Sequence, residues 1–222
     1  MNQPESKEDN GVALGYDAVA EAYASHLYRE LDDKPFDRAF LERFCLSAPD
    51  GKILDAGCGP GHLSSFISDQ GREVIGLDIS SEMVASASRR KPELDFVVGD
   101  MCQMGFEDET FAGVVAFYSI VHFLSEELIE VFRELRRVLM PGGLLGLAFH
   151  VGQEMRHVEE LWGVRTSLDF VFFMPNDVET SLLQAGFEIV SSVCRDPYPD
   201  SVEAQTRRCY VLATAGPRAS FE

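Results

Sequence analysis

Basic residues are scarce in this chain. It contains 19 Lys and Arg against 37 Asp and Glu, which gives a formal net charge of −18. Nucleic-acid backbones and anionic membrane surfaces are held mainly by Lys and Arg, so this composition argues against both kinds of partner. A small anionic ligand remains compatible with it, because a local group of basic residues can act inside an acidic protein.

Paired cysteines and long apolar runs are also missing. The five cysteines form no CxxC pair, and their odd number is typical of reduced thiols, so we expect no metal site. No run approaches the roughly 20 apolar residues of a membrane span. The polar start, MNQPESKEDNG, has no apolar signal core. We therefore predict a cytoplasmic protein.

The chain's 222 residues and 45% apolar content suit one compact domain. Residues 1–12 are polar and without periodicity, so we expect a disordered tail followed by a single domain over 13–222. Apolar residues recur at helical spacing from Gly15 to Leu31 and again from Phe36 to Leu46. These two stretches predict a helical cap over residues 13–50.

Beyond residue 50, apolar runs alternate with helical patterns. The predicted strands cover residues 52–56, 73–78, 95–100, 112–119, 142–150, 187–195 and 207–215. Alternation of this kind favours an α/β fold, with a Rossmann-like, doubly wound, mainly parallel sheet of seven strands. The link between the last two strands, DPYPDSVEAQ, lacks a helix, so the last strand should be antiparallel.

One insertion, residues 151–175, breaks the alternation after the fifth strand. We expect a helix within EMRHVEELWGV and an extra strand within TSLDFVFF. The insertion follows the carboxyl end of a parallel strand, where ligands of open sheets bind. Long connections there are usually functional.

A glycine-rich turn, ILDAGCGPGHL, joins the first predicted strand to its helix. Gly57 and Gly59 allow a tight turn and a close approach of ligand to backbone. A dinucleotide site has glycines at the first, third and sixth positions. Here the third glycine is one place early, at Gly61, and His62 occupies the sixth position. The turn therefore departs from the dinucleotide pattern.

Two acids follow at neighbouring strand ends. Asp78 lies about 20 residues after the turn, where a carboxylate accepts hydrogen bonds from both ribose hydroxyls. Asp100 ends the third strand at the same sheet edge and is placed to accept from the exocyclic amine of adenine. Two such acids describe an adenosine lying across the sheet edge, without a second nucleotide.

Five motifs occur in order and register: LDAGCGPG, VIGLDIS, VVGDM, FAGVVAFYSIVHF and LRRVLMPGGLLGLAF. Together they closely resemble the class I S-adenosylmethionine-dependent methyltransferases, in particular the small-molecule branch. The resemblance covers Gly15 to about Ala215, and YDAVAEAYA is similar to the lid helix common in that branch. It implies that S-adenosylmethionine is the cofactor, S-adenosylhomocysteine the product and a small molecule the methyl acceptor.

The resemblance also implies residue roles around the methionine part of the cofactor. Gly57 and Gly59 would pass beneath it, and Asp55 would brace the turn and help hold the amine. Phe117 would line the cofactor near its sulfur. Tyr16, in the lid helix, would cover it, although core packing explains an aromatic residue on such a helix equally well.

The remaining implied roles concern the nucleoside. Asp78 would bind the ribose, and Ile79 would pack on the adenine. Asp100 would bind the adenine amine, and Met101 would cover the ring. Methionine also fills core gaps readily, which is the alternative at that position.

His122 follows the fourth strand on the ligand side of the sheet, and we predict it as the catalytic base. A histidine there could accept a proton near neutral pH, or it could only orient the substrate. Strand four ends in AFYS and lacks the Asn/Asp-Pro-Pro-Tyr/Phe signature of enzymes that methylate adenine or amides, which favours a small metabolite. The predicted substrate contacts are Tyr23, Tyr118, His150 and Arg156.

Two alternatives to methyl transfer stay open at this point. One is a reductase that binds a nicotinamide dinucleotide, which the early Gly61 and the acid at Asp100 disfavour. The other is a protein that binds S-adenosylmethionine without catalysis, as a sensor or partner subunit.

Overall fold

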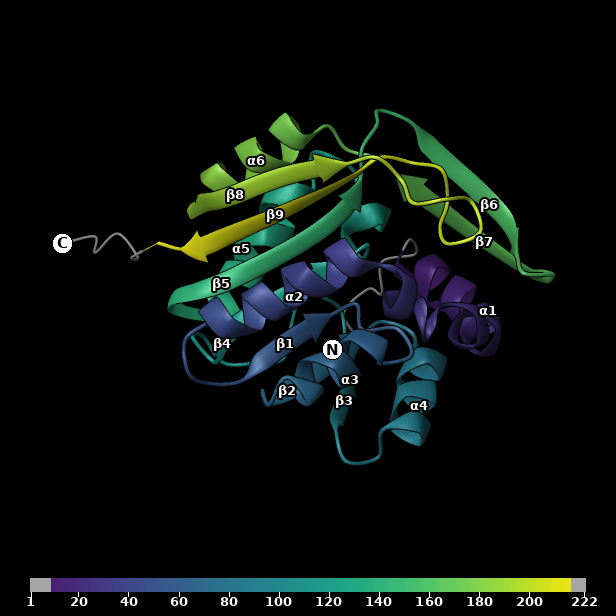
Figure 1. The fold of residues 1–222 in the computed structure, drawn as a ribbon, viewed down its shortest axis with the longest axis horizontal. Helices are drawn as coiled ribbons and strands as arrows, with labels where there is room; N and C mark the ends of the chain where they lie inside the picture. Colours follow the sequence, from purple (N-terminus) through teal and green to yellow (C-terminus); the bar gives the residue numbers. More distant parts are fainter. Residues whose placement is uncertain (1–8, 217–222) are drawn as a thin grey trace, which may run out of the picture.

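A seven-stranded sheet forms the centre of the computed structural model, which describes residues 9–216 (Figure 1). Its strands are β1 (Ile53–Ala56), β2 (Val74–Asp78), β3 (Asp95–Val98), β4 (Phe111–Phe117), β5 (Leu139–His150), β8 (Phe187–Arg195) and β9 (Arg208–Ala215). Their order is β3-β2-β1-β4-β5-β9-β8. Strands β1 to β5 pair in parallel, and β9 is antiparallel to both β5 and β8. The predicted fold class is confirmed, including the antiparallel last strand.

Helices cover both faces of this sheet (Figure 1). On one face, Phe44 of α2 (Pro35–Ser47) and Ile67 of α3 (His62–Asp69) pack in the same core as Ile53. On the other face, Phe132 of α5 (Leu128–Val138) packs with Leu54, and α6 (Pro175–Gln184) joins the same core. Neighbouring residues Ile53 and Leu54 serve opposite cores because side chains alternate along a strand.

Helix α1 (Asp9–Leu27) forms the cap. It begins at Asp9, so the prediction of a disordered tail is wrong for residues 9–12, and residues 1–8 lie outside the described part. Asp17 joins α1 to α4 (Ser81–Arg90). Its carboxylate accepts hydrogen bonds from Ser80 Oγ (2.6 Å) and Glu82 N (3.0 Å) at the start of that helix. This carboxylate satisfies an amide that the first turn of α4 would otherwise leave free.

The insertion after β5 is a two-stranded hairpin rather than a helix and a strand. Strands β6 (Met155–Leu161) and β7 (Val164–Val171) pair antiparallel, so the helix predicted within residues 154–164 is wrong. The turn explains the outcome, because Trp162 and Gly163 both have positive φ (49° and 80°), as a two-residue hairpin turn requires. The polar residues of β6 face solvent on a hairpin as readily as on a helix.

The hairpin packs against the cap. Thr166 Oγ1 donates to the carbonyl of Gly15 at 2.9 Å. A Cβ atom at Gly15 would lie 2.6 Å from Leu168 Cδ2, so a larger residue there would require the leucine side chain to shift. Helix α1 is thereby held between α4 and the hairpin.

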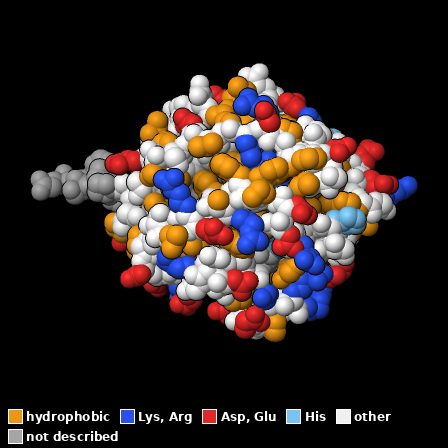
Figure 2. Space-filling view, in the orientation of Figure 1, with side chains coloured by type: hydrophobic (Ala, Val, Ile, Leu, Met, Phe, Trp, Pro, Cys, Tyr) orange, Lys and Arg blue, Asp and Glu red, His pale blue; other side chains and the backbone are white. Residues whose placement is uncertain are grey.

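Charged side chains of both signs are interspersed on the face shown in Figure 2, although the chain carries a formal net charge of −18. Within residues 9–216, none of the helices combines the length and the apolar character needed to cross a membrane.

Candidate functional site

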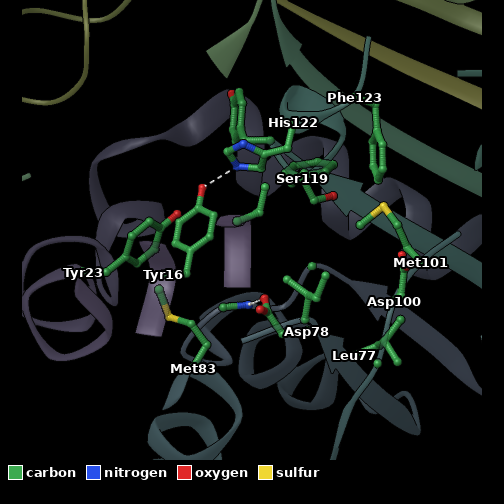
Figure 3. A pocket seen from close by; sticks show the side chains of 17 residues that line it. Tyr16, Tyr23, Leu77, Asp78, Met83, Asp100, Met101, Ser119, His122 and Phe123 are labelled. Atoms are coloured by element: carbon green, nitrogen blue, oxygen red, sulfur yellow. Dashed lines mark hydrogen bonds between the residues drawn. The ribbon is translucent and has the colours of Figure 1, made fainter. Parts of the chain in front are cut away.

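A pocket opens at the carboxyl ends of the parallel strands, beneath α1 (Figure 3). It holds about 770 Å³ of empty space, its open mouth included. We call it the first pocket; it is lined by Val12, Tyr16, Tyr23, Gly57, Gly59, Leu77, Asp78, Ile79, Met83, Gly99, Asp100, Met101, Phe117, Tyr118, Ser119, His122 and Phe123.

The glycine turn after β1 forms part of its wall. Gly57 has φ 79°, and a Cβ atom there would lie 2.3 Å from the Cβ atom of Ser119. Gly59 has φ 53°, and a Cβ there would meet only Tyr23, at 3.9 Å. A side chain at Gly57 is therefore excluded by packing, whereas one at Gly59 would occupy space that the pocket leaves open. The bare backbone lies where a ligand can reach it.

Asp78 ends β2 and points at this turn (Figure 3). Its Oδ2 accepts from Gly59 N at 2.8 Å, and its Oδ1 accepts from Ser80 N at 2.9 Å. Burial raises the pKa of Asp78 to about 6 despite these two backbone hydrogen bonds. The two carboxylate oxygens together have four lone pairs, so Asp78 keeps acceptor capacity for a ligand beside its bonds to the backbone.

Asp55 lies behind the turn and does not line the pocket. It is 1% exposed, and Ser64 Oγ donates to its Oδ2 at 2.6 Å. Burial raises the pKa of Asp55 to about 6, opposed by this hydrogen bond. Ser64 belongs to α3, so the contact joins the end of β1 to the helix that follows the turn.

The other predicted cofactor contacts lie together along the pocket wall. Asp100 follows β3, and its Oδ1 accepts from Cys102 N at 2.8 Å. Ile79, Met101 and Phe117 also line the pocket. The residues that the sequence placed at four strand ends are thus gathered around one cavity.

Tyr16 and His122 are in direct contact in the first pocket (Figure 3). Tyr16 Oη lies 2.8 Å from His122 Nε2, and His122 Nδ1 lies 2.8 Å from the carbonyl oxygen of Asp169. A carbonyl only accepts, so Nδ1 carries the proton and Nε2 accepts from the tyrosine. Burial lowers the pKa of His122 and raises that of Tyr16. Both groups are therefore neutral at pH 7.

Ser119 is a pocket residue that the sequence reasoning missed. Its Oγ is buried and has no hydrogen-bond partner in the described part of the chain. Buried hydroxyls are normally paired, so an orphaned one in a pocket wall points to a ligand. Its position two residues after the end of β4, on the ligand edge of the sheet, was the signal available in the sequence.

A second pocket adjoins the first and shares Tyr16, Tyr23 and Tyr118 with it. Tyr118 follows β4 with φ 54°, a strained backbone conformation for a tyrosine. Burial raises the pKa of Tyr23 and of Tyr118, so these phenols are protonated. The second pocket is lined by Tyr16, Tyr23, His26, Leu27, Glu30, Lys34, Tyr118, Val121, His150, Leu161, Trp162, Phe170, Asp200, Ser201, Val202, Glu203, Ala204 and Arg208.

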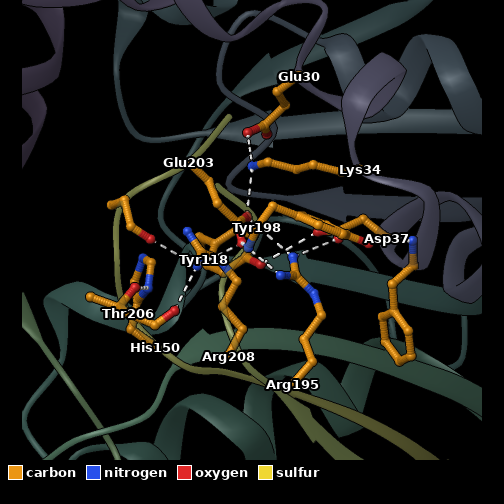
Figure 4. Close-up of polar contacts among 12 residues, drawn as sticks. Glu30, Lys34, Asp37, Tyr118, His150, Arg195, Tyr198, Glu203, Thr206 and Arg208 are labelled. Carbon is orange, nitrogen blue, oxygen red and sulfur yellow. Dashed lines mark hydrogen bonds and ion pairs between the residues drawn. The ribbon is translucent and has the colours of Figure 1, made fainter. Parts of the chain in front are cut away.

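Ion pairs line and underlie this second pocket (Figure 4). Lys34 pairs with Glu30, and Arg195 pairs with Asp37 at 2.9 Å and with Glu203 at 2.6 Å. Burial opposes ionisation of Glu30, but its hydrogen bonds and charge contacts with His62 and Lys34 hold its pKa at about 2. None of these pairings was predicted, and 158 residues separate Asp37 from Arg195 in the sequence.

Of the predicted substrate contacts, Tyr23, Tyr118 and His150 line the second pocket. Arg156 lines neither pocket. It is exposed on β6, pairs with Glu154 at 2.7 Å and lies over the ring of Phe172. Within residues 9–216, no group of three or more His, Cys, Asp and Glu side chains could hold a metal ion.

Comparison with known proteins matches residues 53–143 to the family model of a methyltransferase domain. A demethylmenaquinone methyltransferase of Beutenbergia cavernae is 31% identical over 71% of this chain and 65% of its own length. A malonyl-[acyl-carrier protein] O-methyltransferase of Enterobacter lignolyticus is 28% identical over 70% of this chain and 59% of its own. The chain thus spans less than two thirds of the length of these relatives.

Two solved structures show the same fold. An S-adenosylmethionine-dependent methyltransferase of Methanosarcina mazei has a TM-score of 0.68 at 21% identity, covering 75% of this chain and 93% of its own. The [4+2]-cyclase SpnF has a TM-score of 0.73 at 19% identity, covering 97% and 99%. Since one of the two is a cyclase, the fold alone does not decide the reaction.

Proposed function

Because this chain belongs to the class I S-adenosylmethionine-dependent methyltransferases, we propose that it transfers a methyl group from S-adenosylmethionine to a small-molecule acceptor. The observation that supports this most is the meeting of two pockets at Tyr16, Tyr23 and Tyr118. One pocket has strand-end acids and a bare glycine turn, and the other has room for an acceptor. The family membership leaves the nicotinamide-dependent reductase without support.

The first pocket fits the cofactor. The open acceptor sites of Asp78 would bind the ribose hydroxyls, and Asp100 would bind the adenine amine, with Ile79 and Met101 packing on the ring. The backbone at Gly59 lies where the cofactor would approach the turn without meeting a side chain.

The methionine end of the cofactor would lie near Gly57, Phe117 and Ser119, whose hydroxyl is free to donate to it. Asp55 is covered by the turn, so we assign it the bracing role alone and not a contact with the methionine amine. Its hydrogen bond with Ser64 fixes the turn against α3.

S-adenosylmethionine, when bound, supplies an electrophilic methyl group on a positively charged sulfur. The protein's part is to align the acceptor and to exclude water, which opposes a reaction that disperses this charge. The three shared tyrosines lie where the pockets meet. Tyr16 and Tyr23 belong to α1, and Tyr23 packs against Trp162 at the hairpin turn. Because the phenols are neutral, the junction adds no competing charge.

Tyr16 rather than His122 would contact the acceptor. Tyr16 lines both pockets, whereas His122 lines only the first, and its Nε2 is occupied by the tyrosine hydroxyl. An acceptor hydroxyl or amine would pass its proton to Tyr16 Oη while Tyr16 passes its own to His122 Nε2. The imidazolium that forms would be stabilised by its Nδ1–H bond to the Asp169 carbonyl. This role for Tyr16 modifies the prediction of His122 as a direct base.

Calorimetric titration with S-adenosylhomocysteine and with a nicotinamide dinucleotide tests the cofactor. Binding of the former and not the latter is expected, and the reverse result would overturn the proposal. A mass-spectrometric screen for a 14 Da gain across hydroxyl, amine, thiol and carbon acceptors then tests turnover. Binding without turnover on any acceptor would favour the non-catalytic alternative.

A further inference from the structure

The second pocket contains a buried arginine with one edge of its guanidinium unused. Arg208 is 3% exposed. Its Nη1 donates to the carbonyls of Ala204 (3.0 Å) and Thr206 (2.7 Å) and pairs with Glu203 Oε1 (3.0 Å). Its Nε is buried and has no hydrogen-bond partner in the described part of the chain. Leaving a buried donor unpaired costs on the order of 1–3 kcal/mol, so an accepting ligand atom would restore a missing bond.

Two of the three carboxylates that line this pocket, Glu203 and Glu30, are already engaged. Glu203 accepts from Arg195 through both oxygens, at 2.6 Å and 3.1 Å. Glu30 is held by Lys34 and by His62 Nε2 at 2.9 Å. Neither carboxylate turns to the open edge of the arginine, which leaves that edge for a group from outside the chain.

The lining of the second pocket includes two cations, Lys34 and Arg208, beside three acids, Glu30, Asp200 and Glu203. His150 lines the pocket, and its Nδ1 lies 2.8 Å from Thr206 Oγ1. Burial, followed by the charges of Arg208 and Lys34, lowers the pKa of His150 to about 3. The same charges that keep this imidazole neutral would attract an anion. Glu203 opposes them, and Asp200 is exposed.

Elsewhere the pocket wall is aromatic and apolar. Trp162 at the hairpin turn packs edge-on to Tyr23, with ring centroids 5.6 Å apart, and stacks on His26 at 4.9 Å. Leu161 and Phe170 of the hairpin continue this wall. A ligand with an apolar body would be covered there, because aromatic side chains contribute large contact areas at little entropic cost.

We propose that the second pocket binds the methyl acceptor and recognises an anionic oxygen group on it, a carboxylate or a phosphoryl group, through the open Nε–Nη2 edge of Arg208. The apolar body of the acceptor lies against the hairpin wall. This inference rests on the proposed function and names its substrate class. A guanidinium edge suits both groups, since it presents parallel N–H donors.

The test uses the full chain loaded with S-adenosylhomocysteine and three probes of one shape: benzoate, phenyl phosphate and benzyl alcohol. At least one anion should bind about tenfold or more tightly than the alcohol, since hydrogen bonds between charged groups are the stronger kind. Arg208→Gln should remove that preference and leave the affinity for benzyl alcohol unchanged. The stronger of the two anions identifies the group.

Arg207→Gln is the matched control, because it removes the same charge one residue away. Arg207 is exposed, pairs with Asp196 at 3.2 Å and does not line the pocket. It should retain the anion preference. Equal binding of all three probes, absence of binding, or an unchanged preference in Arg208→Gln would each overturn the inference.

A second measurement covers the case in which Arg208→Gln does not fold. A crystal structure of the unmodified protein with benzoate should place a carboxylate oxygen within hydrogen-bond distance of Arg208 Nε, and benzoate bound elsewhere would overturn the inference. The two proposals fail separately. If S-adenosylhomocysteine does not bind, the proposed function fails, while the same titrations on the unloaded chain still report on the pocket.

Discussion

Asp78 in the first pocket, Asp55 beneath it and Glu30 in the second pocket are buried carboxylates whose pKa values shift in opposite directions. In the first, Asp78 and the underlying Asp55 form no ion pair within residues 9–216, and burial raises the pKa of each to about 6. In the second, burial of Glu30 is outweighed by His62 and Lys34, which hold its pKa at about 2. The first pocket leaves acceptors open for hydroxyl and amine donors. In the second pocket, Glu30 and Glu203 are paired with basic groups, and the unpaired group is a donor, Arg208 Nε.

Removing the Asp78 side chain should weaken ligand binding in the first pocket and leave binding in the second pocket unchanged. Asp78→Ala deletes the acceptor capacity for the ligand and the bonds that hold Gly59 and Ser80. We expect the affinity for S-adenosylhomocysteine to fall about 100-fold or more, roughly 2.7 kcal/mol. Calorimetry gives this affinity, and benzoate binding in the second pocket should persist.

Glu82→Ala is the control for that loss, because it removes an exposed acid four residues further along the chain. The affinity of Glu82→Ala for S-adenosylhomocysteine should equal that of the unmodified protein. If Asp78→Ala binds as well as Glu82→Ala, the ribose assignment is wrong.

The tyrosine hydroxyl at the junction should affect turnover more than binding. Tyr16→Phe keeps the ring and removes the contact to His122. We expect the turnover number to fall roughly 30-fold, less than a full general base contributes, because water can reach His122 in its place. The affinity for S-adenosylhomocysteine should change by less than about threefold. Tyr28→Phe, a nearby tyrosine that lines neither pocket, should change neither quantity.

The pH profile separates this role from a structural one. Burial lowers the pKa of His122 from its usual 6.5, so the unmodified enzyme should keep its turnover at pH 6.5 and lose it at more acidic values, as Nε2 becomes protonated. In Tyr16→Phe the residual rate should keep this acidic limb. A profile that lacks the limb in both proteins would remove His122 from the proton path.

Asp55 should set the pH dependence of stability in the opposite direction to Glu30. The pKa of Asp55 is about 6 when folded against 3.8 for a free aspartate, so the unfolded chain loses this proton first and stability falls as pH rises from about 4 to about 6. Asp55→Asn cannot ionise and still accepts from Ser64. Its free energy of unfolding at pH 7.5 should exceed that of the unmodified protein by about 1–2 kcal/mol, with no gain below pH 4.

Urea denaturation at the two pH values measures this gain. Glu30→Gln is the comparison from the second pocket: its folded pKa lies below the free value of 4.5, so it contributes stability above pH 4.5 that is lost as pH falls toward 2. That variant should be less stable than the unmodified protein at pH 7.5. Equal signs for the two variants would contradict the contrast between the pockets.

The first pocket could be predicted because its residues lie within contiguous motifs. Asp78 and Asp100 each close a short apolar run, and parallel strands bring their carboxyl ends to one edge. The contact between Tyr16 and His122 could not be predicted, since 106 residues separate them. It depends on how α1 packs over the sheet, which no local pattern encodes.

The second pocket could be predicted only in part, and for a physical reason. Lys34 is distant in the sequence from Glu203 and Arg208, and each of the three resembles an ordinary surface charge there. Their burial follows from mutual pairing, which only the folded chain displays. The hairpin was missed because solvent-facing polar residues satisfy a helix and a strand equally, and the turn at Trp162 and Gly163 decided between them.

A substitution in that turn should cause the smallest loss of ligand affinity predicted here, and it should change binding in the second pocket without changing binding in the first. Trp162 is 39% exposed and belongs to the second pocket alone. Trp162→Ala should therefore weaken benzoate or phenyl phosphate about fivefold, near 1 kcal/mol, because a half-exposed aromatic contact gains less than a buried one. Glu159→Ala, an exposed change on β6 outside both pockets, should have no effect. Since Trp162 does not touch the first pocket, affinity for S-adenosylhomocysteine should be unchanged in both variants, and a loss there would mean that the hairpin supports the cofactor site as well.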